Sequence, residues 1–393
     1  MRGDRESPDL KAAACGYWER RGLPTVPAQV VSASGAELLL LALLAVCPGG
    51  TPGPGGPRGV YLPVPGPRWH GTPARLLGLP VHPVPTPAEC GGVPDPFALL
   101  EAVRRDRAAG VDPGVLLLSL VDDPTGTVPP PELLYEVCEA AVDQDLLIVS
   151  DESLRDTCHD PHGTVVVSPA EMLHPQGGAA GSRAGSRGRP VATEGAETAD
   201  AEDVVVLLDL AAALVPGGRH TGLARFPGAG RGRAAADAVR RTLHTLAGPP
   251  GPDPEADLAL SEPAGLRARR EAAARTDGRH AAAVCRAVTA AGGLCRPPQA
   301  GGHLYPDLEP LRDRLARHGV TDAATLEAAL VLRLGPGVLG GHRFGDDPGA
   351  LRARLPVTAQ RDGAQEHPPG APALARVEAA LAELTRTPTE SRP

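Results

Sequence analysis

The chain has 393 residues, of which 42% are hydrophobic and 2% aromatic, so it is long enough for a large and a smaller domain with cores of Leu, Val and Ala. Its 39 basic and 47 acidic residues give a net charge of −8 without a basic cluster. This balance argues against nucleic acid as a main partner.

Apolar strands alternate with helices over the first 150 residues. Strands are predicted at residues 29–32, 60–64, 80–84, 115–120 and 146–149, and helices at 9–21, 36–46, 74–77, 96–109 and 131–143. The strand at 115–120 is apolar throughout, which is typical of a sheet covered on both faces. The alternation predicts an α/β domain with a mainly parallel sheet.

The pattern changes twice in the second half of the chain. Residues 175–203 are small and polar, and they predict a disordered insertion. Further elements are predicted as strands at 204–208 and 303–305 and helices at 232–247, 264–292, 308–318, 323–330 and 373–385. The predicted organisation is an N-terminal helix segment (1–28), a large domain (29–292) and a small α+β domain (293–393).

Lysine is almost absent from the chain. Lys11 is the single lysine among the 39 basic residues, and 48 glycines and 45 prolines complete a composition typical of a GC-rich genome. Such a bias replaces surface lysines by arginine. It cannot replace a catalytic lysine in this way, because a guanidinium stays protonated and is a poor nucleophile. Lys11 is predicted to be a solvated residue of the first helix.

The cysteines and the apolar segments predict a cytoplasmic protein. Seven scattered cysteines form no Cys-x-x-Cys pair, which indicates reduced thiols. The first residues do not resemble a signal peptide, and the apolar run 38–46 is too short to span a bilayer. No metal site is predicted. The closely spaced pair His159 and His162 lies in a predicted polar loop.

Four short motifs follow predicted strands. Ser34-Gly35-Ala36 opens a helix, where free N–H groups favour a phosphate. Asp123-Pro124-Thr125-Gly126 forms a turn, and Asp151 is placed to pair with a protonated ring nitrogen in the crevice at the strand ends. Arg219, after Gly217-Gly218, offers two N–H donors to a phosphate. Alone, the motifs at 34–36 and 123–126 favour ordinary turns, and Asp151 and Arg219 are also compatible with a helix cap and a solvated loop.

In this order and spacing, the motifs resemble the large domain of class I/II aminotransferases of the pyridoxal-phosphate (PLP) fold. The stretch VDDPTGTVPPPELLYEVCEAAVDQDLLIVSDE is the most specific part, and YWERRGLPTVPAQVVSASGAELLLLALLAVCPGG is also similar. GGHLYPDL and LGPGVLGGHRFGDD stand where that family has its small domain. The resemblance implies a three-layer α/β/α large domain, a smaller α+β domain, and a dimer.

The resemblance also implies roles for individual residues. Gly35 and Ala36 would offer N–H groups to the cofactor phosphate, which Arg219 would also bind. Asp151 would hold the pyridinium nitrogen, and Asp123 stands where the family has an asparagine beside the ring hydroxyl.

A substrate carboxylate would be bound by Arg352 or Arg354, and the alternatives stay open.

Several positions depart from the family pattern. The Schiff-base lysine should stand at position 211, which is Ala211, and no lysine follows residue 11. The family's Ser-x-Ser is Leu208-Asp209-Leu210. Asp123 is an anion where the family has an amide donor, so it should repel the ring oxygen. The family's ring-stacking tyrosine falls at Pro67, with Trp69 and His70 nearby, and Ser153 replaces a second tyrosine.

These departures leave two functions open. One is a catalytically degenerate family member that binds a ligand or serves as a dimer partner. The other is an active enzyme that holds PLP or its amine form without a covalent bond and acts on an amino acid or keto acid, with His220 as the base. A homodimer is expected in both cases. A heterodimer with an active homologue, which would supply the lysine, is an alternative.

Overall fold

A computed structural model of the chain describes residues 8–46, 58–173, 203–248, 251, 253–357 and 371–386. Its main feature is a seven-stranded sheet with the order β1-β7-β6-β5-β4-β2-β3. The strands are β1 Val30–Ala33, β2 Arg58–Val64, β3 Val81–Pro85, β4 Asp112–Ser119, β5 Leu147–Asp151, β6 Val204–Asp209 and β7 Gly222–Arg225. Strand β7 is antiparallel to both of its neighbours, and every other pair is parallel.

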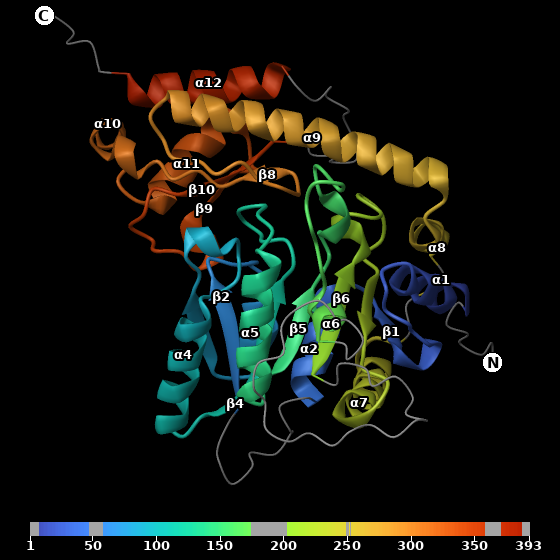
Figure 1. Ribbon diagram of the computed structural model, residues 1–393. Coiled ribbons are helices and arrows are strands. Elements are labelled where there is room, and N and C mark those ends of the chain that lie inside the picture. The colour runs from blue at the N-terminus through green and yellow to red at the C-terminus, as the bar shows by residue number, and fades with distance from the viewer. Residues whose placement is uncertain are drawn as a thin grey trace, which may run out of the picture.

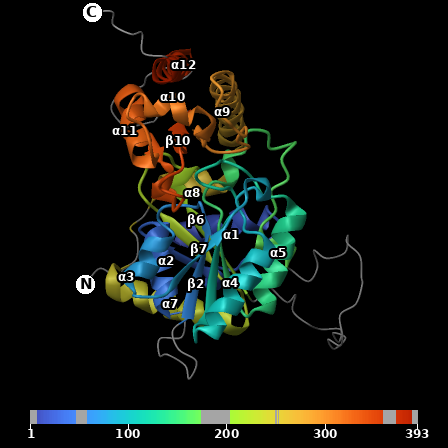
Figure 2. The same cartoon turned by 90° about the vertical axis from the view of Figure 1, so that its left-hand side faces the viewer.

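Helices cover both faces of this sheet. One face carries α1 Pro8–Glu19, α4 Pro96–Ala108, α5 Pro131–Asp143, α6 Pro169–Met172 and α8 Pro254–Ser261. The other face carries α2 Ala36–Val46, α3 Gly71–Leu76 and α7 Gly230–Leu246. Figure 2 shows the sheet between α2, α3 and α7 on one side and α4 and α5 on the other. This is the three-layer arrangement that a sheet apolar on both faces requires.

Alternate residues of each central strand belong to different cores. Leu116 and Leu118 of β4 pack in the core under α4 and α5, whereas Val115 and Leu117 pack in the core under α2 and α7. The same alternation holds in β5 and β6, because successive side chains of a strand point to opposite faces. The face toward α2 and α7 therefore consists of the odd-numbered residues of these three strands.

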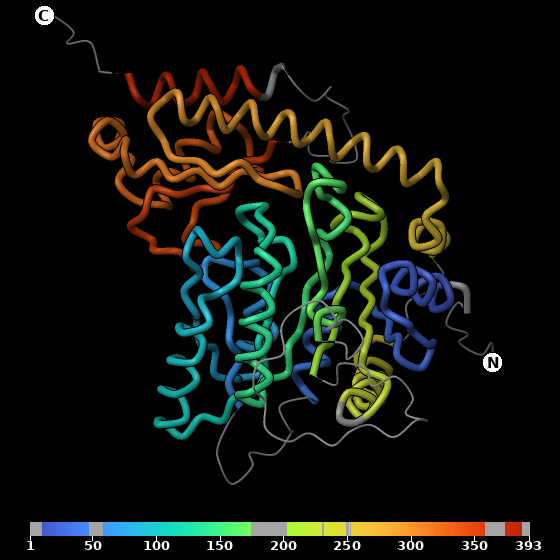
Figure 3. Tube along the Cα trace, viewed as in Figure 1, coloured from blue at the N-terminus to red at the C-terminus, as the bar shows by residue number. Residues whose placement is uncertain are grey.

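The remaining elements enclose an apolar core separate from the two that flank the large sheet, and we call it the second core. They are α9 Ala264–Ala290, β8 His303–Leu304, α10 Arg312–Ala316, α11 Ala323–Leu334, β9 Leu339–Gly340, β10 Ala353–Pro356 and α12 Ala371–Thr385. β10 pairs antiparallel with both β8 and β9. Helix α9 runs along this part of the molecule and contacts α12 (Figure 1). The tube in Figure 3 shows these orange and red segments over one end of the large sheet.

The structure confirms the predicted α/β class and mainly parallel sheet. Several bounds differ by a few residues: β1 begins at Val30, and α11 continues to Leu334. The predicted insertion lies outside the described residues except for residue 203. The division at residue 293 stays a prediction, although Ala281 and Val288 of α9 already pack in the second core. No described helix is long and apolar enough to cross a membrane.

Candidate functional site

A cavity of about 310 Å³ lies at the carboxyl ends of the central strands. Its lining residues are Pro67, Trp69, Ser119, Val121, Asp123, Asp151, Ser153, Leu154, Asp209, Ala211, Ala212, His220 and His303. The sequence motifs after β4, β5 and β6 thus meet at one edge of the sheet, where α/β proteins bind their ligands. We call this cavity the cleft.

Three polar residues extend one face of the sheet into the cleft. Ser119 of β4 is the register partner of Asp151 of β5, which is in turn the partner of Leu207 of β6. Asp209 follows Leu207 by two residues, so it points to the same face. The rung below them is apolar and lies in the core under α2 and α7. The apolar face of the sheet thus ends in three polar side chains, which can form hydrogen bonds with a ligand in the cleft.

Asp151 is held by donors on both of its oxygens. Nε2 of His70 lies 3.0 Å from its Oδ2, and Ser153 donates to Oδ1 from its backbone N–H at 3.0 Å and from its hydroxyl at 2.5 Å. Burial alone would raise the pKa of Asp151, but the His70 hydrogen bond and charge and the Ser153 donors lower it below its ordinary value. Asp151 is therefore an anion that a protonated ring nitrogen or another donor can approach.

Asp123 forms an ion pair with one of the two candidate arginines. Nη1 of Arg354 lies 2.5 Å from its Oδ1, and both side chains are partly buried. His303 is beside this pair and lines the cleft. Burial and the positive charge of Arg354 lower the pKa of His303 to about 4 against the opposing effect of Asp123, so its imidazole is neutral at pH 7.

The position of the expected lysine lies in the cleft wall. Ala211 and Ala212 line the cavity within a short 3-10 helix after β6. Oδ1 of Asp209 caps this turn by accepting from the Ala211 N–H at 3.0 Å. Nδ1 of His220 lies 3.9 Å from Oδ2 of Asp209, and the His220 side chain is 78% exposed. The wall thus presents a methyl group and a carboxylate where the resemblance implies an amine.

The turn at Gly35 and Ala36 lies close to this wall. Gly35 has a φ of +101°, which favours glycine, and a Cβ there would lie 3.8 Å from Cβ of His220. Gly222 of β7 packs against the same turn, since a Cβ on it would lie 2.3 Å from the carbonyl carbon of Gly35. A glycine at position 222 is therefore required for β7 to reach β1. Neither Gly35 nor Ala36 is among the cleft-lining residues.

The structure places the two other predicted arginines outside the cleft lining. Arg219 lines a separate hollow with Asp253 and Glu255 at the start of α8. Arg352 pairs with Asp307 at 2.9 Å and with Asp346 at 3.0 Å. Of the alternatives Arg352 and Arg354, Arg354 is thus the one beside the cleft residue Asp123. The binding roles of all these arginines stay predictions.

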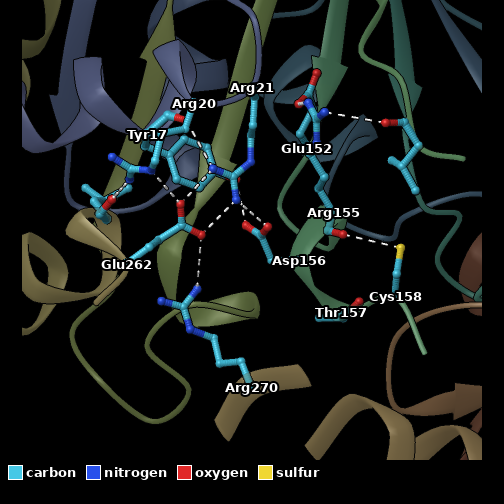
Figure 4. A network of polar contacts seen from close by, with 12 residues as sticks. Tyr17, Arg20, Arg21, Glu152, Arg155, Asp156, Thr157, Cys158, Glu262 and Arg270 are labelled. Carbon is cyan, nitrogen blue, oxygen red and sulfur yellow. Dashed lines mark hydrogen bonds and ion pairs between the residues drawn. The ribbon is translucent and has the colours of Figure 1, made fainter. Parts of the chain in front are cut away.

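A polar network secures the segment that follows Asp151. Arg21, after α1, lies 2.6 Å from Asp156 and 2.9 Å from Glu262, and its guanidinium lies 3.6 Å from the ring centroid of Tyr17 (Figure 4). Arg155 pairs with the buried Glu152 at 3.0 Å. These contacts connect α1, the α8–α9 junction and residues 152–158, so two distant helices hold the loop that supplies Ser153 and Leu154 to the cleft.

Sequence reasoning assigned no function to four residues of this site. Ser119 and Asp209 carried a usable signal, because each continues the alternation of a buried strand by one polar residue at its carboxyl end. The pairing of His70 with Asp151 had none, since 81 residues separate them. His303 gave none either. Among the described residues, no group of three or more His, Cys, Asp or Glu side chains is arranged to hold a metal ion.

Comparisons with known proteins agree with this arrangement. Residues 3–177 match the model of the family described as aminotransferase class I and II. An aspartate aminotransferase mutant of Thermus thermophilus has a TM-score of 0.72 at 21% identity, with 96% of this chain and 86% of that chain covered.

Two further solved structures are similar over the same share of this chain. N-succinyldiaminopimelate aminotransferase from Mycobacterium tuberculosis has a TM-score of 0.69 at 20% identity, with 96% of this chain and 83% of that chain covered. The aspartate aminotransferase from Rhizobium meliloti has a TM-score of 0.69 at 17% identity, with 96% and 81% covered. Among curated proteins, none matches. At these identities the structural likeness establishes the fold.

Proposed function

Because residues 3–177 match the model of the family described as aminotransferase class I and II, we propose that the chain is a catalytically degenerate member of this family that binds a small molecule in the cleft. The observation that carries this proposal is Ala211 in the cleft wall. A methyl group forms no Schiff base and moves no proton, and these are the two tasks that a lysine performs there. Lys11, the single lysine of the chain, lies on α1 and is not among the cleft-lining residues.

The cleft fits one end of PLP and not the other. A protonated ring nitrogen matches Asp151, whose pKa is lowered and whose oxygens are fixed by His70 and Ser153. No lysine or arginine is among the residues that line the described cleft, and Arg219 lies at a separate hollow. A covalent bond to the cofactor is excluded at position 211. PLP bound in this cleft would therefore be held non-covalently, with its ring nitrogen on Asp151.

A second candidate function rests on His220. This side chain lines the cleft beside Ala211, and its Nδ1 lies 3.9 Å from Oδ2 of Asp209. An imidazole beside a carboxylate has the chemistry of a general base. In this alternative the protein is a slow enzyme of the family that acts on an amino acid while it holds PLP or its amine form non-covalently. The high exposure of His220 favours the first function.

The proposal is tested by titrating the purified protein with PLP and comparing it with an Ala211→Lys variant. The variant is expected to gain the visible absorbance of a Schiff base and a reducible adduct at the introduced lysine, because position 211 lines the cleft. The wild-type protein is expected to form no adduct beyond that of Lys11 or the terminal amine, which a Lys11→Arg variant identifies.

Turnover separates the two candidate functions. Amino acids are supplied with PLP, and keto-acid formation is measured for the wild-type protein and for His220→Gln. No keto acid is expected from either protein. Turnover that the wild type shows and His220→Gln loses would overturn the degenerate assignment in favour of the slow enzyme. The homodimer, and the heterodimer with an active homologue, stay predictions that mass measurement of the purified protein tests.

A further inference from the structure

The carboxylates of the cleft differ in how they are neutralised. Asp151 has His70 as its partner, and Asp123 has Arg354. Asp209 forms no ion pair with an arginine or lysine among the described residues, and the nearest imidazole nitrogen, Nδ1 of His220, is 3.9 Å away. Its side chain is 22% exposed and lines the cleft beside Ala211. A partly buried carboxylate without a cation beside it favours a positively charged ligand group.

Ser119 provides an independent sign of a ligand. Its hydroxyl oxygen is buried and has no hydrogen-bond partner within the described part of the chain, and the residue is 4% exposed. Ser119 nevertheless lines the cleft, on the same sheet face as Asp151. A buried hydroxyl that makes no hydrogen bond costs stability unless a ligand or water satisfies it. The cleft therefore offers a hydrogen-bonding group at its β4 end and a carboxylate at its β6 end.

The remaining walls exclude an anion and suit a flat ring. Trp69, Val121 and Leu154 supply apolar surface, and His303 is neutral at pH 7. The volume of about 310 Å³ is at the lower end of the range of roughly 300–1,000 Å³ for ligand pockets. β4 and β6 are two strand spacings apart, which is roughly 10 Å. A single ring with one substituent at each end spans this distance.

We infer that the cleft binds a small aromatic primary amine, with its ammonium group on Asp209 in the space a lysine side chain would take and a hydroxyl-like group on Ser119. Oδ2 of Asp209 accepts from the ammonium, while Oδ1 keeps its bond to the Ala211 N–H. The ring lies between these ends, beside Trp69. This inference rests on the proposed function, because it requires the wall at position 211 to carry no amine of its own.

The test uses 4-hydroxybenzylamine as the probe and isothermal titration as the measurement. Two analogues replace the ammonium: 4-hydroxybenzyl alcohol is neutral, and 4-hydroxybenzoate is an anion. The amine is expected to bind at least about tenfold more tightly than either analogue, because a charge-assisted hydrogen bond is strong in a partly buried site. Benzylamine, which has no hydroxyl, isolates the contribution of Ser119.

Variants assign the two ends of the ligand. Asp209→Asn keeps an oxygen for the Ala211 N–H and removes the charge, and it is expected to weaken the amine about tenfold. Ser119→Ala should weaken 4-hydroxybenzylamine about threefold and leave benzylamine unchanged. Its melting temperature should not fall, since the hydroxyl has no partner to lose. Glu101→Gln, which removes one exposed acid of α4, is the control and should bind like the wild type.

Three outcomes would overturn the inference: no binding of the amine to the folded wild type, equal binding of 4-hydroxybenzoate, or equal affinity of Asp209→Asn and Glu101→Gln. None of these results depends on turnover or on a Schiff base. A failed ligand assignment therefore leaves the catalytically degenerate function standing. Keto-acid formation by the wild type would instead remove that function.

Discussion

Nη1 of Arg354 lies 2.5 Å from Oδ1 of Asp123, and this ion pair joins β10 to the turn after β4. The guanidinium also lies 5.1 Å from the ring centroid of Phe344. The sequence predicted that Asp123 would repel a ligand oxygen. In the structure its charge is instead compensated by an arginine that would otherwise be available to a carboxylate. The pair thus removes both an anion and a cation from the cleft.

The Asp123→Asn variant should leave Arg354 free to bind an anionic ligand. Without the carboxylate, Arg354 keeps its charge beside the cleft, so the affinity for 4-hydroxybenzoate should rise about tenfold. The free energy of unfolding should fall by about 1–3 kcal/mol, because a charged hydrogen bond is lost. Asp346→Asn is the matched control: it removes one of the two carboxylate partners of Arg352, an arginine that does not line the cleft. It should lose stability without gaining affinity for the anion, and equal gains in both variants would contradict the prediction.

The His70→Ala variant should show how far the cleft depends on the imidazole beside Asp151. It leaves the carboxylate of Asp151 buried without its imidazole, which should cost about 2–4 kcal/mol of stability. His82→Ala breaks a comparable pair, in which Nδ1 lies 2.9 Å from Asp106, away from the cleft. Both variants should be destabilised, but only His70→Ala should strengthen amine binding in titration, because it leaves Asp151 in the cleft without its imidazole partner. An equal effect of both on binding would show that His70 has no role in the site.

The His70→Ala variant should also change how the free energy of unfolding depends on acidic pH. The native pKa of Asp151 is below its unfolded value of roughly 3.9, so its contribution to stability is complete above that pH and is lost as the pH falls through the native pKa. Removing His70 removes the largest lowering cause. Urea unfolding between pH 3 and 7 should therefore show a smaller loss below pH 4 for the variant than for the wild type.

The sequence predicts the scaffold better than the contacts that complete it. The apolar runs that became β4, β5 and β6 are long enough to identify from their composition alone, and the motifs after them lie at one sheet edge. Strand β7 was missed because Gly222–Arg225 is short and ends in an arginine. Its strand conformation comes from pairing with β1 and β6, which are distant in the sequence.

The site shows the same limit. Ala211 lies in the cleft lining, and its position relative to Arg219 follows from spacing within one segment. Its equivalence to the family's lysine stays a prediction. The Asp123–Arg354 pair joins residues 231 positions apart, and His70 reaches Asp151 across 81. Such pairs depend on how the second core is placed over the sheet, which local patterns do not encode. The sequence predicts that Arg219 binds a phosphate, and in the structure its side chain lines another hollow.

Asp122 should make stability depend on pH near neutrality. Burial and the neighbouring charge of Asp123 raise its pKa to about 7, against the opposing hydrogen bonds from Thr125. The native state then binds more protons than the unfolded state between roughly pH 4 and 7, so stability falls as the pH rises through this window and is constant above it. Over the whole window the loss is up to about 4 kcal/mol.

The Asp122→Asn variant tests this dependence. It keeps an acceptor for Thr125 and removes the titration, so its stability relative to the wild type should increase between pH 5 and 8 in urea unfolding. Asp322→Asn is the control, because the pKa of Asp322 is lowered and the group stays ionised across these conditions. Parallel pH profiles of the Asp122→Asn variant and the wild type would show that Asp122 does not titrate here.

The Arg21→Ala variant should loosen the cleft from a distance. Arg21 bridges Asp156 and Glu262 above the ring of Tyr17, and it is 14% exposed (Figure 4). Its removal leaves the partly buried Asp156 without an arginine partner, which should cost about 2–4 kcal/mol. Amide hydrogen exchange should become faster in residues 152–158, which include two cleft residues, and the affinity for the amine should fall as well.

The control is Arg20→Ala, which removes a more exposed arginine that also contacts Glu262. It should cost less than about 1 kcal/mol. If exchange in this segment were the same in both variants, the network would not be what holds the loop.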